Sequence, residues 1–259
     1  MLGQSPVEYR EMTIKLLINT FIRSLFIHSS LNFPRMQNLG FCFSMGPVLK
    51  KLKLPPPMKA AFIKRHLQLF NTNPYMSSAI IGSVVREELQ GEGQDEETVE
   101  CLKNTFMAPY AAMGDPLFSG ALKPFCSTVA VLLAFMGFLF VPFIYLVLFN
   151  PIHFWIRLKG FLAGYREGNG AFKFITVLNV PRLTAIIRTT TLVAAGILSA
   201  YLLFVFGGEL GIPEHAALGF ISGFVVVLLS YGLIKMGIPQ TMLLYGYASL
   251  ALVVSWFLC

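Results

Sequence analysis

The segment STVAVLLAFMGFLFVPFIYLVLF, residues 127–149, runs for 23 residues without one charged side chain. The hydrocarbon core of a bilayer is about 30 Å thick, and an α-helix needs about 20 apolar residues to cross it. The length and apolar composition of this segment therefore predict a transmembrane helix.

Three further apolar stretches follow it, at 183–206, 216–234 and 238–258. The whole chain is 55% hydrophobic and only 13% charged, whereas a soluble domain carries about a quarter charged residues. Of the 33 Asp, Glu, Lys and Arg residues, 23 lie in residues 1–125 and 10 in residues 126–259. The apolar excess thus lies in the second half, and we expect about four transmembrane helices in 127–259.

The first 70 residues have a different character. In TIKLLINTFIRSLFIHSSL, residues 13–31, apolar residues recur at helical spacing while Lys15, Asn19 and Arg23 fall on another face. This pattern predicts an amphipathic helix in the lipid headgroup region, or else a surface helix packed on its own protein. A Lys-rich, Pro-rich linker (50–57) and a second basic helix predict that residues 1–70 lie on the cytoplasmic membrane surface.

Residues 71–126 contain two apolar stretches, 71–85 and 104–125, separated by an acidic segment. The first is too short to cross a bilayer. The second is interrupted by Pro109, by Gly114-Asp115-Pro116 and by Gly120. Interrupted segments at membrane depth are tolerated only against protein or a water-filled cavity. We therefore predict two broken or re-entrant membrane segments, which makes the expected fold an all-α, polytopic membrane protein.

The charges of the connections predict the orientation. Residues 150–182, expected to form a loop, carry five Lys or Arg residues against Glu167 alone, whereas 207–215 carries only Glu209 and Glu214. Basic loops stay in the cytoplasm, so the N-terminus is expected inside and the C-terminus outside. The net charge of +7 fits membrane edges better than nucleic acid, because no compact basic run is interleaved with aromatic residues.

Four sequence segments match the motifs of one protein family, in the same order along the chain. They are SLNFPRMQNLGFCFSMGPVLKKL (30–52), IKRHLQLFNTNPYMSSAIIG (63–82), FMAPYAAMGDPLFSGALKP (106–124) and GYREGNG (164–170). They resemble the IID subunits of mannose/fructose/sorbose-type phosphotransferase systems (PTS). The resemblance covers about residues 10–180 well and the C-terminal stretches loosely, and it implies that the whole chain is one PTS IID domain.

The resemblance also implies a function. A IID subunit pairs with IIC, as a trimer of heterodimers, in the bacterial plasma (inner) membrane. The complex translocates a hexose-type sugar, which the IIA and IIB proteins phosphorylate on the cytoplasmic side; the phosphate donor is a histidine of IIB. We therefore expect no catalytic residue, cofactor or metal site in this chain, and membrane lipid rather than nucleic acid as its other partner.

Three positions depart from the family pattern. The family has Trp where this chain has Ser119, and Thr or Ser and Arg where it has Ala121 and Lys123. Lysine keeps the charge but loses the planar fork of arginine. These departures leave open an alternative function, a non-transporting membrane scaffold or regulator that retains the IID fold.

The candidate site residues come from two of the motif blocks. Asp115, between Gly114 and Pro116, is a functional carboxylate inside the membrane, the cap of a helix that begins at Pro116, or both. The polar groups of Asn71, Thr72 and Asn73, just before Pro74, either contact sugar hydroxyls or line a pore, or they build a turn. Gly114, Pro74 and Pro116 are expected to shape the backbone there.

The remaining polar residues suggest no chemistry. Glu87 and Glu88 are expected to belong to a solvated charge cluster, and His66 to a surface helix. Cys42, Cys101, Cys126 and Cys259 show no metal-ligand spacing and are expected to be free thiols.

Overall fold

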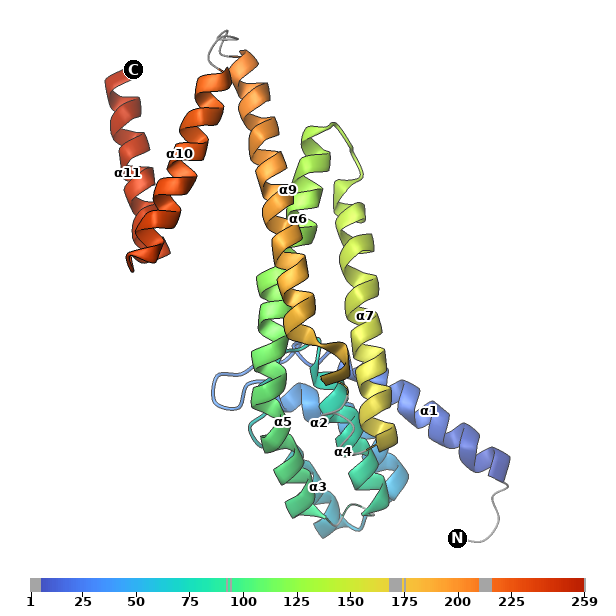
Figure 1. Cartoon of the computed structure of the whole chain (residues 1–259). Coiled ribbons are helices and arrows are strands. Elements are labelled where there is room, and N and C mark those ends of the chain that lie inside the picture. Colours follow the sequence, from blue (N-terminus) through green and yellow to red (C-terminus); the bar gives the residue numbers. More distant parts are fainter. Residues whose placement is uncertain are drawn as a thin grey trace. The chain divides into compact units, whose positions relative to one another are not determined.

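The computed structural model describes residues 6–91, 93, 95–167, 174, 176–209 and 216–258. The described part is helical throughout, and its only β contacts are the isolated bridges Asn32–Met36 and Met36–Phe70 (Figure 1). The chain divides into two compact units, Met1–Ala194 and Ala195–Cys259. The all-α architecture expected from the sequence is confirmed.

The first unit begins with four helices, α1 (Pro6–Ser24), α2 (Asn38–Leu52), α3 (Pro56–His66) and α4 (Ser77–Gln90). Helix α3 starts with prolines in its first turn, where the missing N–H is not needed. Helix α2 packs against α1, α3 and α4. Their shared core is fully buried and includes Phe41, Met45, Phe62, Phe70 and Ile80.

Helix α4 packs against α7 (Val141–Glu167) at very short range. A Cβ added to Gly82 would lie 2.2 Å from the carbonyl oxygen of Phe161, and one added to Gly164 would lie 2.1 Å from that of Ala79. Only glycine permits backbones to approach this closely. The apolar stretch 71–85 thus forms a turn followed by a helix that is buried against protein, while its re-entry into the membrane remains a prediction.

The predicted break within 104–125 is wrong. Helix α5 (Glu96–Leu117) continues through a π-helical turn (Phe118–Leu122) into α6 (Lys123–Phe135), giving one 40-residue helical stretch. Pro109 and Pro116 lie inside α5. A helix that is supported on its sides can tolerate the loss of the hydrogen bond that each proline removes. The wider π turn begins two residues after Pro116.

The single helix predicted over 127–149 is also wrong. Helix α6 ends at Phe135, α7 begins at Val141, and the two pack side by side (Figure 1). Gly137 has φ +87°. Its N–H donates to Ala134 O at 3.0 Å, and that of Phe138 donates to Leu133 O at 3.1 Å, which is the glycine-terminated end of a helix. Residues 150–167 consequently lie in α7 and not in a loop.

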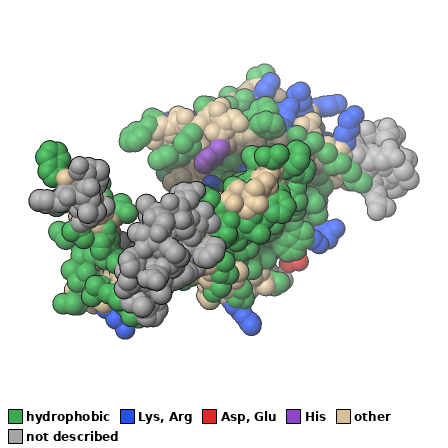
Figure 2. All heavy atoms as spheres, turned by 90° about the horizontal axis from the view of Figure 1, so that it is seen from above, with side chains coloured by type: hydrophobic (Ala, Val, Ile, Leu, Met, Phe, Trp, Pro, Cys, Tyr) green, Lys and Arg blue, Asp and Glu red, His purple; other side chains and the backbone are tan. Residues whose placement is uncertain are grey.

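Within the described residues, two helical stretches are long and apolar enough to cross a membrane, Glu96–Phe135 and Val141–Glu167. The hairpin tip that joins them (residues 136–140) is exposed and apolar, with Leu139 89% and Phe140 78% exposed. Hydrophobic side chains also form a large part of the described surface in Figure 2, with Lys and Arg side chains at its edges. Exposed apolar surface on this scale indicates a membrane or protein contact.

The second unit contains the end of α9 (Val180–Glu209), α10 (Ala216–Lys235) and α11 (Gln240–Leu258). These three helices coincide with the apolar stretches 183–206, 216–234 and 238–258. The turn between α10 and α11 repeats the chemistry of the hairpin tip, because Gly237 has φ +90° and Ile238 N–H donates to Leu233 O at 3.1 Å.

Helix α1 has two apolar sides. Leu16 is buried against the protein, whereas Ile14, Ile18 and Ile22 are about half exposed along the other side. Arg23 folds back, and its Nη1 donates to Phe43 O at 3.3 Å. Helix α1 therefore packs on its own protein and still presents an isoleucine row, so its position in the headgroup region remains a prediction.

Candidate functional site

The segment between α3 and α4 is a turn organised by Asn73. The Oδ1 atom of Asn73 accepts a hydrogen bond from Tyr75 N–H at 3.0 Å, and its carbonyl oxygen accepts from Ser77 N–H at 2.9 Å. Asn73 is 2% exposed and Pro74 is half-buried. Asn73 thus builds a turn, one of the two roles expected for it. Its Nδ2 group remains available to donate a hydrogen bond elsewhere.

Asn73 Nδ2 donates to Asp115 Oδ1 at 2.8 Å, joining residues 42 positions apart. Gly114 makes this contact possible, since a Cβ there would lie 2.4 Å from Asn73 Cβ. The structure therefore brings together Asn73, Gly114 and Asp115 from two motif blocks. Asp115 itself is exposed, so its carboxylate is accessible from outside the chain.

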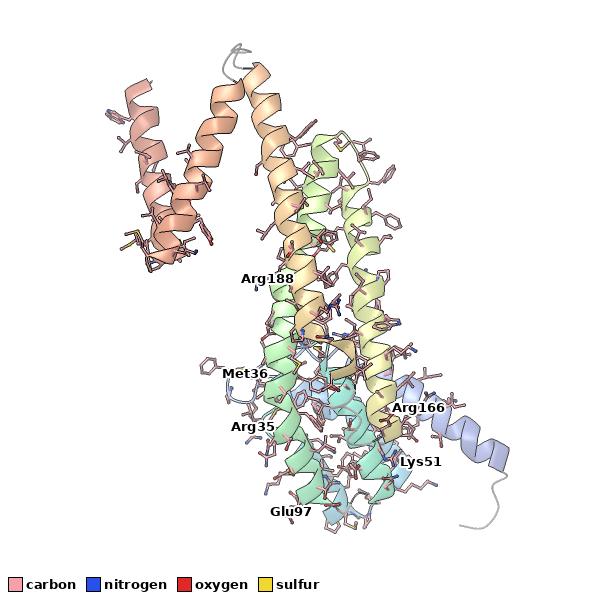
Figure 3. The ribbon with its side chains drawn as sticks, in the orientation of Figure 1. Arg35, Met36, Lys51, Glu97, Arg166 and Arg188 are labelled. Carbon is pink, nitrogen blue, oxygen red and sulfur yellow. The ribbon has the colours of Figure 1, made fainter. Side chains whose placement is uncertain are left out.

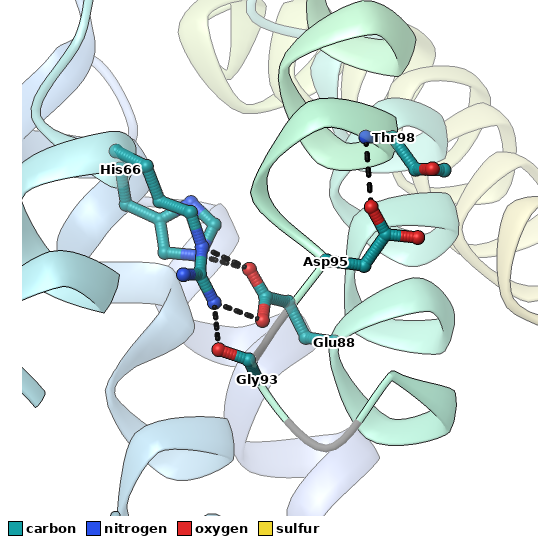
Figure 4. Close-up of polar contacts among 6 residues, drawn as sticks. His66, Glu88, Gly93, Asp95 and Thr98 are labelled. Carbon is teal, nitrogen blue, oxygen red and sulfur yellow. Dashed lines mark hydrogen bonds and ion pairs between the residues drawn. The ribbon is translucent and has the colours of Figure 1, made fainter. Parts of the chain in front are cut away.

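The cap predicted at Asp115 is wrong. Asp115 and Pro116 lie in the last turn of α5, which begins at Glu96 and continues beyond them as the π-helical turn. The residue that caps α5 is Asp95, whose Oδ1 accepts from Thr98 N–H at 3.0 Å (Figure 4). The Asp115 carboxylate does not cap a helix. Among the hydrogen bonds of the described residues, it accepts only the one from Asn73.

Thr72 connects the turn to its surroundings, whereas Asn71 is exposed. Thr72 Oγ1 donates to Met107 O at 3.0 Å. The side chain of Gln37 donates to Thr72 O at 2.6 Å and lies 2.8 Å from His28 Nε2. Thr72 therefore holds the turn in place. Neither Gln37 nor His28 was predicted to act in this role.

Tyr75 is the centre of a second group of side chains that sequence reasoning missed. Its ring lies 5.5 Å from Lys123 Nζ and 5.3 Å from the guanidinium carbon of Arg157. The rings of Phe118 and His153 lie 4.5 and 5.2 Å from it. Cations over an aromatic ring are attracted by its negative face. An electropositive region thus adjoins the Asn73–Asp115 pair.

The three departures from the family pattern lie in or just after the π-helical turn. Ser119 is exposed, Ala121 is fully buried, and Lys123 is half-buried above Tyr75. Single π turns are frequent at functional sites. Asp115, this turn and Tyr75 together form the candidate site.

A buried ionic cluster lies apart from this site, and it overturns two expectations. Glu88 is 1% exposed and His66 fully buried, so neither belongs to a solvated surface. Arg65 donates to both carboxylate oxygens of Glu88, at 2.8 and 2.5 Å, and to Gly93 O at 2.9 Å (Figure 4). His66 Nε2 lies 2.9 Å from Glu88 Oε1, although neither ring nitrogen makes a well-directed hydrogen bond.

Two opposing effects set the charges in this cluster. Burial lowers the pKa of His66 to about 4, against the opposing effect of Glu88. Burial would raise the pKa of Glu88, but the adjacent His66 and Arg65 side chains outweigh it and hold that pKa below its usual range. At neutral pH the cluster is therefore an Arg65–Glu88 ion pair beside a neutral histidine.

Stability should fall on acidification. Unfolded His66 takes up a proton near pH 6.5, whereas the folded protein resists it down to about pH 4. The unfolded state thus binds more protons in this window, and the free energy of unfolding should drop by roughly 3 kcal/mol across it. Glu88 adds a further loss as pH falls through its lowered pKa. Thermal melts in detergent between pH 7 and 4 measure this loss of stability. The variant His66→Gln should show a flatter pH dependence of stability above pH 5.

Three of the charged residues labelled in Figure 3 mark one end of the first unit. Lys51, Glu97 and Arg166 lie toward the same end, where α5 begins and α7 finishes. Arg86 on α4 joins this end by donating to the carbonyl oxygen of Arg166. No group of three potential metal ligands occurs in the residues that the structure describes. Cys42, Cys101 and Cys126 are free thiols, and Cys259 lies outside the described residues.

Known proteins resemble this chain in sequence and fold. The family description "PTS system mannose/fructose/sorbose family IID component" matches residues 11–206. The fructose permease IID component of Bacillus subtilis (strain 168) is 32% identical over 178 residues, 68% of this chain and 65% of that protein. The mannose-specific EIID component of Escherichia coli (strain K12) is 35% identical over 164 residues, 61% and 58% respectively. The chain thus matches less than two thirds of the length of these relatives.

Two solved structures share the fold. One is a cryoEM structure of the mannose transporter ManYZ with microcin E492, with TM-score 0.58, 23% identity and coverage of 92% of this chain and 94% of that one. The other, described as a membrane protein, gives TM-score 0.70, 23% identity and coverage of 93% and 96%. With its apolar helices, the chain is a membrane protein, and it belongs to the mannose/fructose/sorbose family of PTS IID components.

Proposed function

We propose that this chain is the IID subunit of a sugar permease, which with a IIC subunit translocates a hexose-type sugar coupled to phosphorylation by IIA and IIB. The observation that carries the proposal is the Asn73–Asp115 hydrogen bond, which unites two family motif blocks at an exposed carboxylate. Amides and carboxylates suit sugar hydroxyls, because an amide both donates and accepts hydrogen bonds and a carboxylate accepts them. Phosphoryl transfer is assigned to IIB, and most of the sugar contacts are assigned to IIC.

Asp115→Asn should lower sugar uptake about tenfold or more while leaving the protein folded. Asparagine keeps an oxygen that can accept from Asn73, but it removes the charge, and hydrogen bonds to charged groups contribute about 1.5–3 kcal/mol. Asp115→Ala also removes the bond to Asn73 and should lower the yield of assembled complex. Uptake of labelled sugar and co-purification with IIC measure the two effects separately.

Glu97→Gln is the matched control, because Glu97 is an exposed carboxylate on the same helix. Its uptake should equal that of the wild type. Normal uptake in both Asp115 variants would remove Asp115 from the site and transfer the hypothesis to Asn71 and Asn73.

The α6–α7 hairpin determines how the chain is arranged across the membrane in the proposed topology. Helices α6 and α7 run in opposite directions, so the chain returns to the side from which α5 starts, whether the hairpin crosses the bilayer or only enters it. Helices α9, α10 and α11 then supply three crossings. A cytoplasmic N-terminus and an external C-terminus follow, in keeping with Arg166 at the end of α7 and Lys235 at the end of α10. Labelling of Cys259 from outside intact cells tests this.

A non-transporting scaffold is the second candidate, and the replacement of the family tryptophan by Ser119 favours it. The exposed serine cannot supply the apolar surface of an indole ring. Genes for IIA, IIB and IIC proteins beside this one support the permease, and their absence supports the scaffold. Sugar uptake by the co-expressed pair decides between the two.

A further inference from the structure

Arg157 is a buried cation on α7 without a carboxylate partner among the described residues. It is 5% exposed. Its Nη1 donates to Ser24 O at 3.5 Å, the outer limit for a hydrogen bond, and its buried Nε has no acceptor. The face of Tyr75 is its other contact. Burying an unpaired charge costs several kcal/mol, and these weak contacts do not offset that cost.

The groups around Arg157 are basic as well. Desolvation and then the positive charges of Arg157 and Lys123 lower the pKa of His28. His153, one turn before Arg157, is 9% exposed and has no hydrogen-bond partner for its Nδ1. We call Lys123, His153 and Arg157, which surround Tyr75, together with His28, the basic patch. The neighbouring carboxylate, Asp115, forms no ion pair with any of them in the described part of the chain.

The position of Arg157 restricts what can neutralise it. Helix α7 is one of the two apolar stretches fit to cross a membrane, where bulk water and counterions are excluded. Charged groups in such helices pair with one another or face a polar cavity. A hexose is neutral, so the proposed substrate leaves the charge unbalanced. The counter-charge must come from another group fixed at the same depth.

We propose that the basic patch receives a carboxylate side chain from a transmembrane helix of the IIC subunit, and that Arg157 forms an ion pair with it. The inference rests on the proposed function, because that supplies the partner. Arginine suits the task, since its planar fork binds a carboxylate through two parallel hydrogen bonds. Lys123 is half-buried and His28 is exposed, whereas Arg157 is buried.

The test separates assembly from folding. Arg157→Met removes the charge and keeps an apolar chain of similar length. When this variant is co-expressed with IIC and purified in mild detergent, the amount of IIC that co-purifies should be at least tenfold lower than with the wild type. The isolated variant should melt at the same temperature as the wild type or higher, because an unpaired buried charge has gone. Lys159→Met is the matched control: Lys159 is exposed on the same helix, and its variant should recover IIC normally.

Charge exchange then identifies the partner group. Each Asp and Glu in the transmembrane helices of IIC is changed to Asn or Gln, and one change should reproduce the loss. Arg157→Glu combined with Arg at that IIC position should restore co-purification. Normal recovery of IIC by Arg157→Met overturns the inference, as does a markedly lower melting temperature of the isolated variant.

Two further outcomes distinguish failure of this inference from failure of the proposed function. If Arg157→Met loses IIC but no IIC carboxylate variant does, the patch binds another anion, such as a phospholipid headgroup, and the inference fails. If the wild-type chain does not co-purify with IIC at all, the proposed function fails and the inference falls with it.

Discussion

Glu88→Gln should lower the free energy of unfolding by about 3–5 kcal/mol, the usual effect of removing one partner from a buried ion pair. The substitution leaves the guanidinium of Arg65 in the core, 2% exposed, with only Gly93 O and a neutral amide as acceptors. The side-chain volume hardly changes, so lost charge and not lost packing is measured. Thermal and denaturant unfolding in detergent report the difference.

Glu87→Gln provides the matched control one residue away. Glu87 is only half-buried and makes none of the ion pairs found among the described residues, so its variant should unfold within about 0.5 kcal/mol of the wild type. The double variant Arg65→Met/Glu88→Leu removes both charges and should be more stable than Glu88→Gln. Equal stability of Glu87→Gln and Glu88→Gln would contradict the ion pair.

Gly164→Ala is expected to prevent α4 and α7 from packing. The added methyl group would lie 2.1 Å from Ala79 O and 2.8 Å from Ser83 N, and these are backbone atoms that no rotamer change can move. Overpacking a core costs about 1–3 kcal/mol even when side chains can adjust, so a larger loss is expected here. The yield of monodisperse protein and its melting temperature measure the effect.

Gly160→Ala is a graded comparison on the same helix. A Cβ at Gly160 would approach Ala79 Cβ and a Phe174 ring atom to 3.2 Å, so shifts of a few tenths of an ångström in these neighbours can accommodate it. The loss should be clearly smaller than at Gly164. If the two variants behave alike, the close approach of α4 and α7 is incorrect.

Much of the fold could be predicted from hydropathy, and the exceptions have physical reasons. Gly137 and Gly237 end helices in the same way, each between a methionine and an apolar residue. The second turn lies between the predicted stretches 216–234 and 238–258, where Lys235 interrupts the apolar sequence. The first has no charge beside it, and hydropathy over a window of about 20 residues cannot detect a turn composed of apolar residues.

The candidate site was predicted in part for a different reason. Motif resemblance selected Asn73 and Asp115, but only the tertiary structure shows that they meet and that α5 runs on past Asp115. The basic patch was not predicted, because Tyr75, Lys123 and Arg157 are far apart in sequence and each has an ordinary surface or interfacial interpretation. Burial decides their roles, as it does for His66 and Glu88, and burial of a charged residue cannot be read from its neighbours in sequence.

The apolar tip of the α6–α7 hairpin has a consequence for biogenesis. Residues 136–140 are Met, Gly, Phe, Leu and Phe, so the leading end of the hairpin has no charge to dehydrate as it enters lipid. Moving a charge across a membrane couples its insertion to the electrical potential, at about 2.3 kcal/mol per charge per 100 mV. An uncharged tip has no such coupling. With the cytoplasmic N-terminus proposed above, the hairpin would therefore insert from the cytoplasmic face with no hydrophilic segment at its tip to export.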